Sequence, residues 1–543
     1  LKQANGLPCI LADRAMRQRP AVAAAAALRY RISTGADLIA LRGCAATATI
    51  AAGRPGERPT LRLVPRISGQ RGGDARVSRL SPWIFRNEAA NVDELRALGH
   101  PALLVDVVNS EGTELGTAVC NLQKGGPMGT VNILGRMLAD NILQPIDKMF
   151  FSARVRQALQ HRMQAFGSSW PYYRLLNAEG DLLPGTICDR FDDVLVVQFA
   201  SAAMELLFEQ DVLDILEAIL KPRAILVRYD RFVDRQMELA PIQRPRVARG
   251  TYVGPTLVPF EASALPRRLR PSSQEESSDG EKGEGVDADD DRIAGGDGFA
   301  IEADLLAETW TPGRHFEERR IRAALARLVV GGETPSAGAA SSGTARRSAD
   351  AAPSTDSGLR VLSLFGEGLG VFCGAIATGD PARAGPRVTY AHGSTGARDV
   401  GGQAPTDSDA GRRELVAALV AKRLCPESVE FVPVGTPGPH ALGENHRAAY
   451  DVVLLEPPPL APTYSRFEEG SQLYSAWTTT AALATRPGGH LLVACRSRKM
   501  TAAKLLRCVN LGLWAAGRRA RLVDRWGGGP VDFPVHMSLL DMQ

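Results

Sequence analysis

The sequence has few cysteines and no long hydrophobic run. Eight of its 543 residues are cysteine and none lies in a Cys-x-x-Cys pair, so neither a zinc site nor a disulfide framework is predicted. No apolar stretch reaches the roughly 18 residues that a membrane helix needs, and we expect no membrane partner. With 44% hydrophobic and 23% charged residues, the chain reads as a globular protein of several domains.

Acidic residues are scarce at the start of the chain. Residues 1–80 hold 14 Lys and Arg against four acids, a net charge of +10, while the whole chain carries +4. This stretch is rich in Arg and Ala, which is typical of an organelle targeting segment, and we expect a mitochondrial protein. The alternatives are a plastid location, or a cytoplasmic protein whose basic arm is disordered or is translation read from upstream sequence.

Two segments far apart predict buried strands that end in unusual turns. Arg360 to Phe365 leads into the glycines Gly366, Gly368 and Gly370, a layout that suits a nucleotide-like cofactor because glycines let backbone N–H groups approach it. Tyr450 to Leu455 leads into Glu456 and three prolines, which stop the strand. We expect both turns to meet at one crevice at the carboxyl edge of a parallel sheet.

A third segment completes the pattern. Residues 486–490 read Arg-Pro-Gly-Gly-His, which predicts a break before a strand at 491–495 that ends in Cys495. The order of glycine turn, acid-Pro-Pro and Pro-Gly-Gly resembles the class I S-adenosyl-L-methionine (SAM) dependent methyltransferase domain. That resemblance implies a Rossmann-like fold over residues 299–543.

Two further motifs make the resemblance more specific. Ser81-Pro82-Trp83-Ile84-Phe85 is similar to the opening of a PUA domain, a small RNA-binding barrel. Residues 173–191, Tyr-Arg-Leu-Leu-Asn-Ala-Glu-Gly-Asp-Leu-Leu-Pro-Gly-Thr-Ile-Cys-Asp-Arg-Phe, resemble the signature of the PUA-containing large-subunit ribosomal RNA cytosine-5 methyltransferases. The resemblance implies ribosomal RNA as partner, and possible further partners are large-subunit ribosomal proteins or assembly factors.

The family resemblance also implies the chemistry. Cytosine C5 is a poor nucleophile, so a Cys thiolate adds to C6, C5 takes the methyl group, and a base removes the C5 proton. Cys495 matches the nucleophile, and the neighbouring Arg496 is expected to lower its pKa. Glu456 matches the catalytic acid-Pro-Pro position. The alternative for Cys495 is a buried, inert residue.

The expected cofactor positions differ from the family pattern. Besides the three glycines, the cofactor-binding candidates are Ser363, Phe365, His392, Glu317 and Arg319. Ser363 and His392 stand where the family has acids, and an imidazole cannot accept two hydrogen bonds from a ribose diol as a carboxylate does. An acid is also missing after the third strand, at Gly435.

Two functional hypotheses therefore stand side by side. In the first, the protein is a catalytically impaired RNA-binding member of the family that acts in assembly of an organellar ribosome; the replaced acids favour it. In the second, it is an active SAM-dependent ribosomal RNA cytosine-5 methyltransferase; Cys495 and the glycines favour it. A methyltransferase with another target atom, such as a nitrogen, is a third and weaker reading.

We expect a multidomain α/β protein in which a PUA-like barrel, a central α+β domain and a Rossmann-like domain follow one another. The barrel strands are expected at 60–64, 82–85, 102–108 and 116–121, from alternating apolar residues between polar turns. Ten acids and two basic residues in 272–298 predict a disordered insertion. The expected segments are a basic arm at 1–59, the PUA-like domain at 60–142, the central domain at 143–265, the acidic insertion at 266–298 and the methyltransferase domain at 299–543.

Overall fold

The computed structural model describes the chain in segments between Arg54 and Val535. They are residues 54–65, 77, 81–123, 133–229, 244–259, 300–307, 312–331, 359–365, 387–392, 429–461, 466–497, 500–527 and 531–535. The insertion expected at 266–298 lies outside them. Within the described residues, no helix is both long and apolar enough to cross a membrane.

The N-terminal domain contains a five-stranded mixed sheet. Its strands lie in the order β1-β3-β4-β5-β2. The elements are β1 (Thr60–Arg62), β2 (Trp83–Phe85), η1 (Arg86–Glu88), α3 (Val92–Ala97), β3 (Ala102–Val108), β4 (Glu114–Asn121) and β5 (Ile133–Ala139). Buried aliphatic side chains from all five strands and from α3 form one core cluster. The four strands expected from the sequence are confirmed within one or two residues at most ends, and β5 is an additional one.

The central domain is a second five-stranded sheet with two long helices. Its order is β10-β9-β8-β7-β6, and β8 and β9 are the parallel pair, joined by α5. The elements are α4 (Lys148–Phe166), β6 (Tyr172–Asn177), η2 (Ala178–Asp181), β7 (Thr186–Phe191), β8 (Val194–Phe199), α5 (Ala202–Leu220), β9 (Ala224–Arg228) and β10 (Arg246–Gly250). Both helices begin at residues whose side chains accept a backbone hydrogen bond, Asp147 and Ser201.

A short hairpin follows the central sheet. β11 (Thr256–Pro259) pairs antiparallel with β12 (Ala300–Ala303), and Pro259 lies opposite Ala300. The acidic insertion therefore leaves and rejoins the described structure at the same end of one strand pair.

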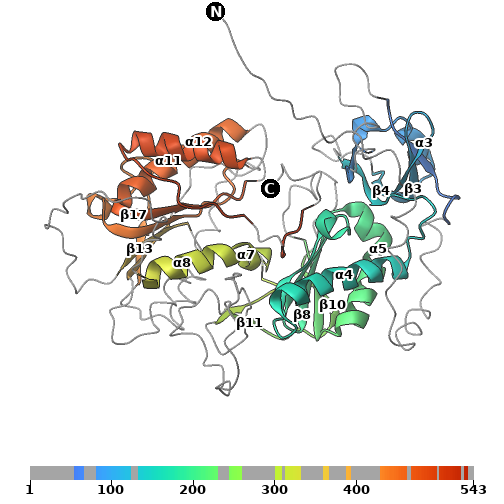
Figure 1. The fold of residues 1–543 in the computed structure, drawn as a ribbon, viewed down its shortest axis with the longest axis horizontal. Helices are drawn as coiled ribbons and strands as arrows, with labels where there is room; N and C mark the ends of the chain where they lie inside the picture. Colours follow the sequence, from blue (N-terminus) through green and yellow to red (C-terminus); the bar gives the residue numbers. More distant parts are fainter. Residues whose placement is uncertain are drawn as a thin grey trace, which may run out of the picture. The chain divides into compact units, whose positions relative to one another are not determined.

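The C-terminal domain is an all-parallel sheet in the order β15-β14-β13-β16-β17, with α11 and α12 lying together on one face (Figure 1). Its elements are α7 (Pro312–Glu317), α8 (Arg319–Gly331), β13 (Arg360–Leu364), β14 (Arg387–His392), β15 (Val429–Pro433), η6 (Glu444–His446), β16 (Tyr450–Leu455), α11 (Phe467–Ala484), β17 (Thr485–Val493) and α12 (Ala502–Ala515). The two strands with near-continuous apolar runs, β13 and β16, occupy the centre, as expected for a sheet covered on both faces.

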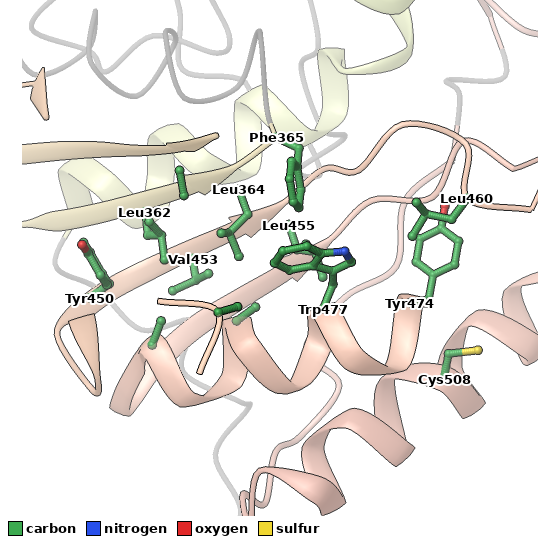
Figure 2. Packing of buried hydrophobic residues seen from close by; sticks show 14 of the residues in the cluster. Leu362, Leu364, Phe365, Tyr450, Val453, Leu455, Leu460, Tyr474, Trp477 and Cys508 are labelled. Atoms are coloured by element: carbon green, nitrogen blue, oxygen red, sulfur yellow. The ribbon is translucent and has the colours of Figure 1, made fainter. Parts of the chain in front are cut away.

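The core of this domain lies between the sheet and α11. Trp477 and Tyr474 of α11 are fully buried in one cluster with side chains of β13 and β16, and Figure 2 shows Trp477 beside Phe365 and Leu455 and Tyr474 beside Leu460. Gly512 lets α12 approach α11 closely, because a Cβ at this position would lie 2.5 Å from the carbonyl oxygen of Ser475. The packing fixes α11 against the two strands whose ends carry the candidate site.

Candidate functional site

The ends of β13 and β16 lie side by side. Leu364 is in register with Leu455, and the backbone N–H of Glu456 donates to the carbonyl of Leu364 at 3.0 Å. The chain leaves β13 toward β14 on one side, whereas β16 leads to β17 on the other. Such a reversal of strand order is where open α/β sheets bind ligands. The expected adjacency of these two strand ends is confirmed, whereas the position of the glycines and the expected crevice stay predictions.

Phe365 has a left-handed backbone at the end of β13. Its φ is +63°, a value that non-glycine residues rarely adopt, and its ring packs edge-on against Trp477 with 4.6 Å between ring centroids. Backbone strain of this kind persists where the surrounding packing enforces it, often at a binding site. The following glycines Gly366, Gly368 and Gly370 lie outside the described residues.

Ser363 and His392 occupy strand positions at the same edge. The hydroxyl of Ser363 is buried and makes no hydrogen bond to any described residue. Leu362 and Leu364 belong to the core facing α11, so Ser363 points to the other face of the sheet. His392 ends β14 in register with Pro433, and only its backbone is described. Their roles toward a cofactor stay predictions.

Glu456 and Arg496 form an ion pair at the carboxyl edge. The backbone N–H of Ala494 donates to the carbonyl of Leu455 at 2.9 Å, which brings the chain after β17 beside Glu456. Arg496 Nη2 lies 3.5 Å from the buried carboxylate of Glu456 and 2.6 Å from that of Glu318, between α7 and α8. One guanidinium is therefore placed between two acids.

Cys495 lies two residues beyond the end of β17, because the strand begins at Thr485 and ends at Val493, earlier than expected. Burial raises the pKa of its thiol, and hydrogen bonds with Tyr474 and Ser497 offset part of this effect. The pKa is thus raised, against the expectation that Arg496 would lower it, and the Arg496 guanidinium pairs with acids. A thiol with a raised pKa is protonated at neutral pH and is a weak nucleophile.

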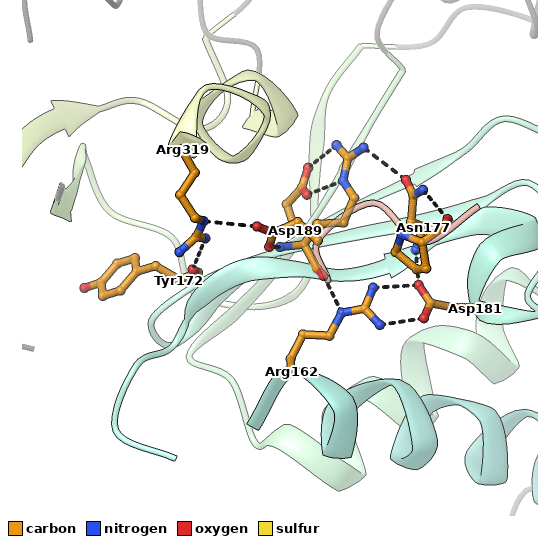
Figure 3. A network of polar contacts seen from close by, with 9 residues as sticks. Arg162, Tyr172, Asn177, Asp181, Asp189 and Arg319 are labelled. Carbon is orange, nitrogen blue, oxygen red and sulfur yellow. Dashed lines mark hydrogen bonds and ion pairs between the residues drawn. The ribbon is translucent and has the colours of Figure 1, made fainter. Parts of the chain in front are cut away.

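Glu317 and Arg319 are the remaining predicted cofactor residues, and they face different surroundings. Glu317 is exposed and lies within electrostatic range of Arg174 and Arg496. The guanidinium of Arg319 lies 3.1 Å from the carboxylate of Asp532 and donates to the carbonyl of Tyr172 at 3.0 Å (Figure 3). In this structure Arg319 therefore links the C-terminal segment to the central sheet.

The most specific sequence motif, residues 173–191, forms a buried polar network (Figure 3). Arg174 makes two hydrogen bonds to Asp189, of 2.7 and 3.0 Å, and Asp181 receives two from Arg162 of α4, of 2.5 and 2.7 Å. These charges are paired within the network. The motif thus supplies structural contacts, a role that the sequence pattern did not reveal.

The same motif holds segments from both ends of the described chain. Glu179 accepts a hydrogen bond of 2.8 Å from the Trp83 indole and pairs with Arg136, both in the N-terminal domain. At the other end, Asp532 accepts from the backbone N–H of Arg174 at 3.0 Å. A Cβ at Gly180 would lie 1.7 Å from the carbonyl oxygen of Pro534, so only glycine allows this approach.

Comparisons with known proteins agree with this architecture. A PUA-like domain family matches residues 70–128. The chain is 32% identical over 175 residues to the ribosomal RNA large subunit methyltransferase I of Pseudoalteromonas translucida, covering 32% of this chain and 41% of that protein. It is 29% identical over 203 residues to the Salmonella arizonae protein of the same name, covering 37% and 47%. The chain thus matches less than half the length of these curated relatives.

Solved structures resemble the chain more extensively. A crystal structure described as a methyltransferase complexed with SAH superposes with a TM-score of 0.54 over 88% of this chain and 96% of that one, at 13% identity. A protein described as SAM-dependent from Streptococcus mutans gives 0.53 with the same coverage and identity. At such identity the likeness concerns the fold. The chain thus contains a PUA-like domain, resembles large-subunit ribosomal RNA methyltransferases over part of their length, and shares the fold of solved methyltransferase structures.

Proposed function

We propose that this protein binds SAM at the ends of β13 and β16 and methylates ribosomal RNA of the large subunit. The observation that carries the proposal is the backbone hydrogen bond from Glu456 to Leu364, which joins the end of β13 to the acid-Pro-Pro turn at the strand reversal. The curated relatives and the PUA-like domain support ribosomal RNA as the substrate.

The residues at this edge fit a nucleotide-like cofactor. Phe365 has a strained backbone directly before the glycines of the sequence. The hydroxyl of Ser363, which has no hydrogen-bond partner among the described residues, offers a polar group near the end of the same strand. We assign Phe365, Gly366, Gly368 and Gly370 to cofactor binding, with Ser363, His392, Glu317 and Arg319 as further candidates. When bound, the cofactor supplies an electrophilic methyl group.

Cys495 and Glu456 are the candidate catalytic residues. Cys495 must lose its proton before its sulfur can add to C6 of a cytosine, and burial opposes that loss. Glu456 is a buried carboxylate, and Arg496 at 3.5 Å favours its charged form. A charged Glu456 is able to accept a proton, so the pair provides a nucleophile and a base at neighbouring strand ends.

The second candidate function is RNA binding without methyl transfer, in assembly of an organellar ribosome. The raised pKa of Cys495 and the serine in place of an acid at Ser363 favour it. A thiol that stays protonated at neutral pH reacts slowly, and a hydroxyl replaces a carboxylate with a weaker acceptor.

Two measurements separate these candidates. Calorimetry with the full chain measures SAM binding, and transfer of tritiated methyl groups to undermodified large-subunit RNA measures activity. SAM binding together with methyl transfer that is lost in Cys495→Ser supports the enzyme. If the protein neither binds SAM nor transfers methyl groups but still binds RNA, the enzyme is rejected in favour of the RNA-binding function. A covalent adduct between wild-type protein and 5-fluorocytosine RNA would identify Cys495 as the nucleophile if Cys495→Ser abolishes it.

The organellar part of the proposal rests on the basic arm. Residues 1–80 carry a net charge of +10, and we propose that residues 1–59 direct import into mitochondria. A fluorescent protein fused behind residues 1–59 should localise to mitochondria, and replacing the arginines of this segment with glutamines should abolish import. Diffuse fluorescence of the unaltered fusion would contradict this assignment, while plastid fluorescence would assign the other organelle.

A further inference from the structure

Helix α12 presents an exposed stripe that the core does not use. Cys508 and Gly512 are buried against α11, whereas Lys504, Arg507 and Leu511 are exposed and Trp514 is 82% exposed. The exposed residues are spaced three or four apart, so they lie on one side of the helix. A tryptophan this exposed is unusual, because burial of its ring would contribute more than that of most side chains.

The chain that follows α12 continues the same character. Arg518 is half-buried, and Arg519, Arg521 and Arg525 are exposed, as are Leu522 at 65% and Val523 at 62%. Residues 501–527 contain six Lys and Arg against one acid, Asp524. We call the exposed side chains of residues 504–525 the α12 surface. Residues 501–527 have five more basic than acidic residues, whereas residues 81–543 as a whole carry a net charge of −6.

Cations combined with exposed rings match the chemistry of single-stranded RNA. Lys and Arg neutralise phosphates, and an exposed ring provides a face on which an unpaired base stacks. A basic surface of this kind complements phosphates and disfavours a basic protein partner, and the exposed ring adds a face for stacking. Charge and aromatic exposure together favour RNA as the occupant, and an acidic protein is the alternative that the test distinguishes.

We propose that the α12 surface binds a single-stranded segment of RNA, with Trp514 stacking on a base and Arg507, Arg518, Arg519 and Arg521 contacting phosphates. The proposal rests on the proposed function, since it gives the RNA substrate a second contact area besides the PUA-like domain. It also assigns this contact to the methyltransferase domain itself, so that the crevice and part of the RNA-binding surface belong to one domain.

The test measures fluorescence anisotropy of a labelled 15-nucleotide single-stranded RNA with the full chain. Trp514→Leu should weaken binding about tenfold, the size expected for one lost base stack, while Trp514→Phe should bind almost as wild type. A variant in which Arg507, Arg518, Arg519 and Arg521 are all replaced with alanine should show a slope of log affinity against log salt that is smaller in magnitude by about 3. Arg156→Ala on α4 and Leu206→Ala on α5 are matched exposed controls that should change neither quantity.

The outcomes are unambiguous. If Trp514→Leu binds the RNA as tightly as Trp514→Phe, stacking is refuted, and the surface serves a protein or a second copy of this chain instead. If the two Trp514 variants differ from the wild type in folding stability, the variant without the four arginines still tests RNA binding through its salt slope. SAM calorimetry on the wild type and on Trp514→Leu keeps the two proposals apart. If the wild type does not bind SAM, only the enzyme proposal is rejected. If Trp514→Leu binds both SAM and RNA as the wild type does, only the proposal for the α12 surface is rejected.

Discussion

Arg496 and Glu318 form a short ion pair, 2.6 Å between Nη2 and Oε1, that joins the end of the parallel sheet to the junction of α7 and α8. The same guanidinium reaches Glu456 at 3.5 Å. The side chains of Glu318 and Glu456 are 8% and 0% exposed, so this arginine compensates two buried carboxylates.

We expect Arg496→Ala to lower the free energy of unfolding by about 3–5 kcal/mol, because it removes a shared counter-charge from two buried carboxylates. Urea unfolding followed by circular dichroism measures the change. Arg223→Ala is the control: its pair with Asp193 is 43% and 49% exposed, and the loss should be at most about 1 kcal/mol. Adding Glu318→Gln and Glu456→Gln to Arg496→Ala should recover part of the loss; equal losses in both arginine variants would contradict the role of Arg496.

The reactivity of Cys495 should increase with pH well beyond neutrality. Burial raises its pKa, so the thiolate fraction keeps growing above the pH at which an ordinary cysteine, of pKa about 8.5, is ionised. Iodoacetamide labelling followed by peptide mass spectrometry should show a rate still rising above pH 9. A rate that is constant from pH 7 would show an activated thiol. Cys495→Ser identifies the peptide.

Buried thiols should also make the fold less stable in alkali. Burial raises the pKa of Cys120 to about 12. Because the folded thiol keeps its proton where the unfolded one loses it, its contribution to stability is complete below pH of about 8.5 and is lost as pH rises toward 12. Cys120→Ala should flatten the dependence of unfolding free energy on pH between these values. An unchanged slope would assign the loss to other groups, such as Tyr172, whose pKa burial also raises to about 12.

Gly180→Ala should release the C-terminal segment 531–535. The added Cβ would lie 1.7 Å from the carbonyl of Pro534, so the segment must move and Phe533 loses its burial, a cost of about 1.5–3 kcal/mol. Limited proteolysis should cut this segment faster, as it should in Asp532→Ala. Gly527→Ala is the matched control, since nothing lies within 4 Å of its Cβ position. Equal cleavage of Gly180→Ala and Gly527→Ala would contradict the contact.

Replacing residues 260–299 with a linker of five glycines and serines should preserve the fold. β11 and β12 pair across this insertion, and shortening 40 residues to about five favours closure of the hairpin by about 2 kcal/mol. The melting temperature should therefore stay constant or rise. A large fall would show that the inserted residues themselves stabilise the protein.

The sequence predicted the two central strands of the parallel sheet well, because they are short apolar runs that lead into glycines or prolines. β13 (Arg360–Leu364) and β16 (Tyr450–Leu455) agree with the expected strands to within one residue. The start of β17 was less predictable, because Pro487 and two glycines predicted a break, yet the strand includes them. Its pairing with β16 is irregular there, with a register shift between Tyr450 and Val452 of β16. An irregular pairing of this kind depends on the neighbouring strand and leaves no local signal.

The sequence predicted that the ends of β13 and β16 meet, but not the contacts made there. In a parallel sheet, backbone topology alone brings these strand ends together. The partners of Arg496 were not predictable, because Glu318 lies 178 residues away and only the fold brings it near. The same holds for Asp532 and Arg174, which are separated by 358 residues.

The buried network around Arg174, Asp181 and Asp189 has a consequence for how its sequence motif is interpreted. The motif contacts α4, the N-terminal domain and the C-terminal segment, so we expect it to stabilise the fold independently of any chemistry at the strand ends. An inactive protein with this fold would need these residues as much as an active enzyme. The motif therefore indicates the architecture, and activity has to be judged from the residues at the ends of β13, β16 and β17.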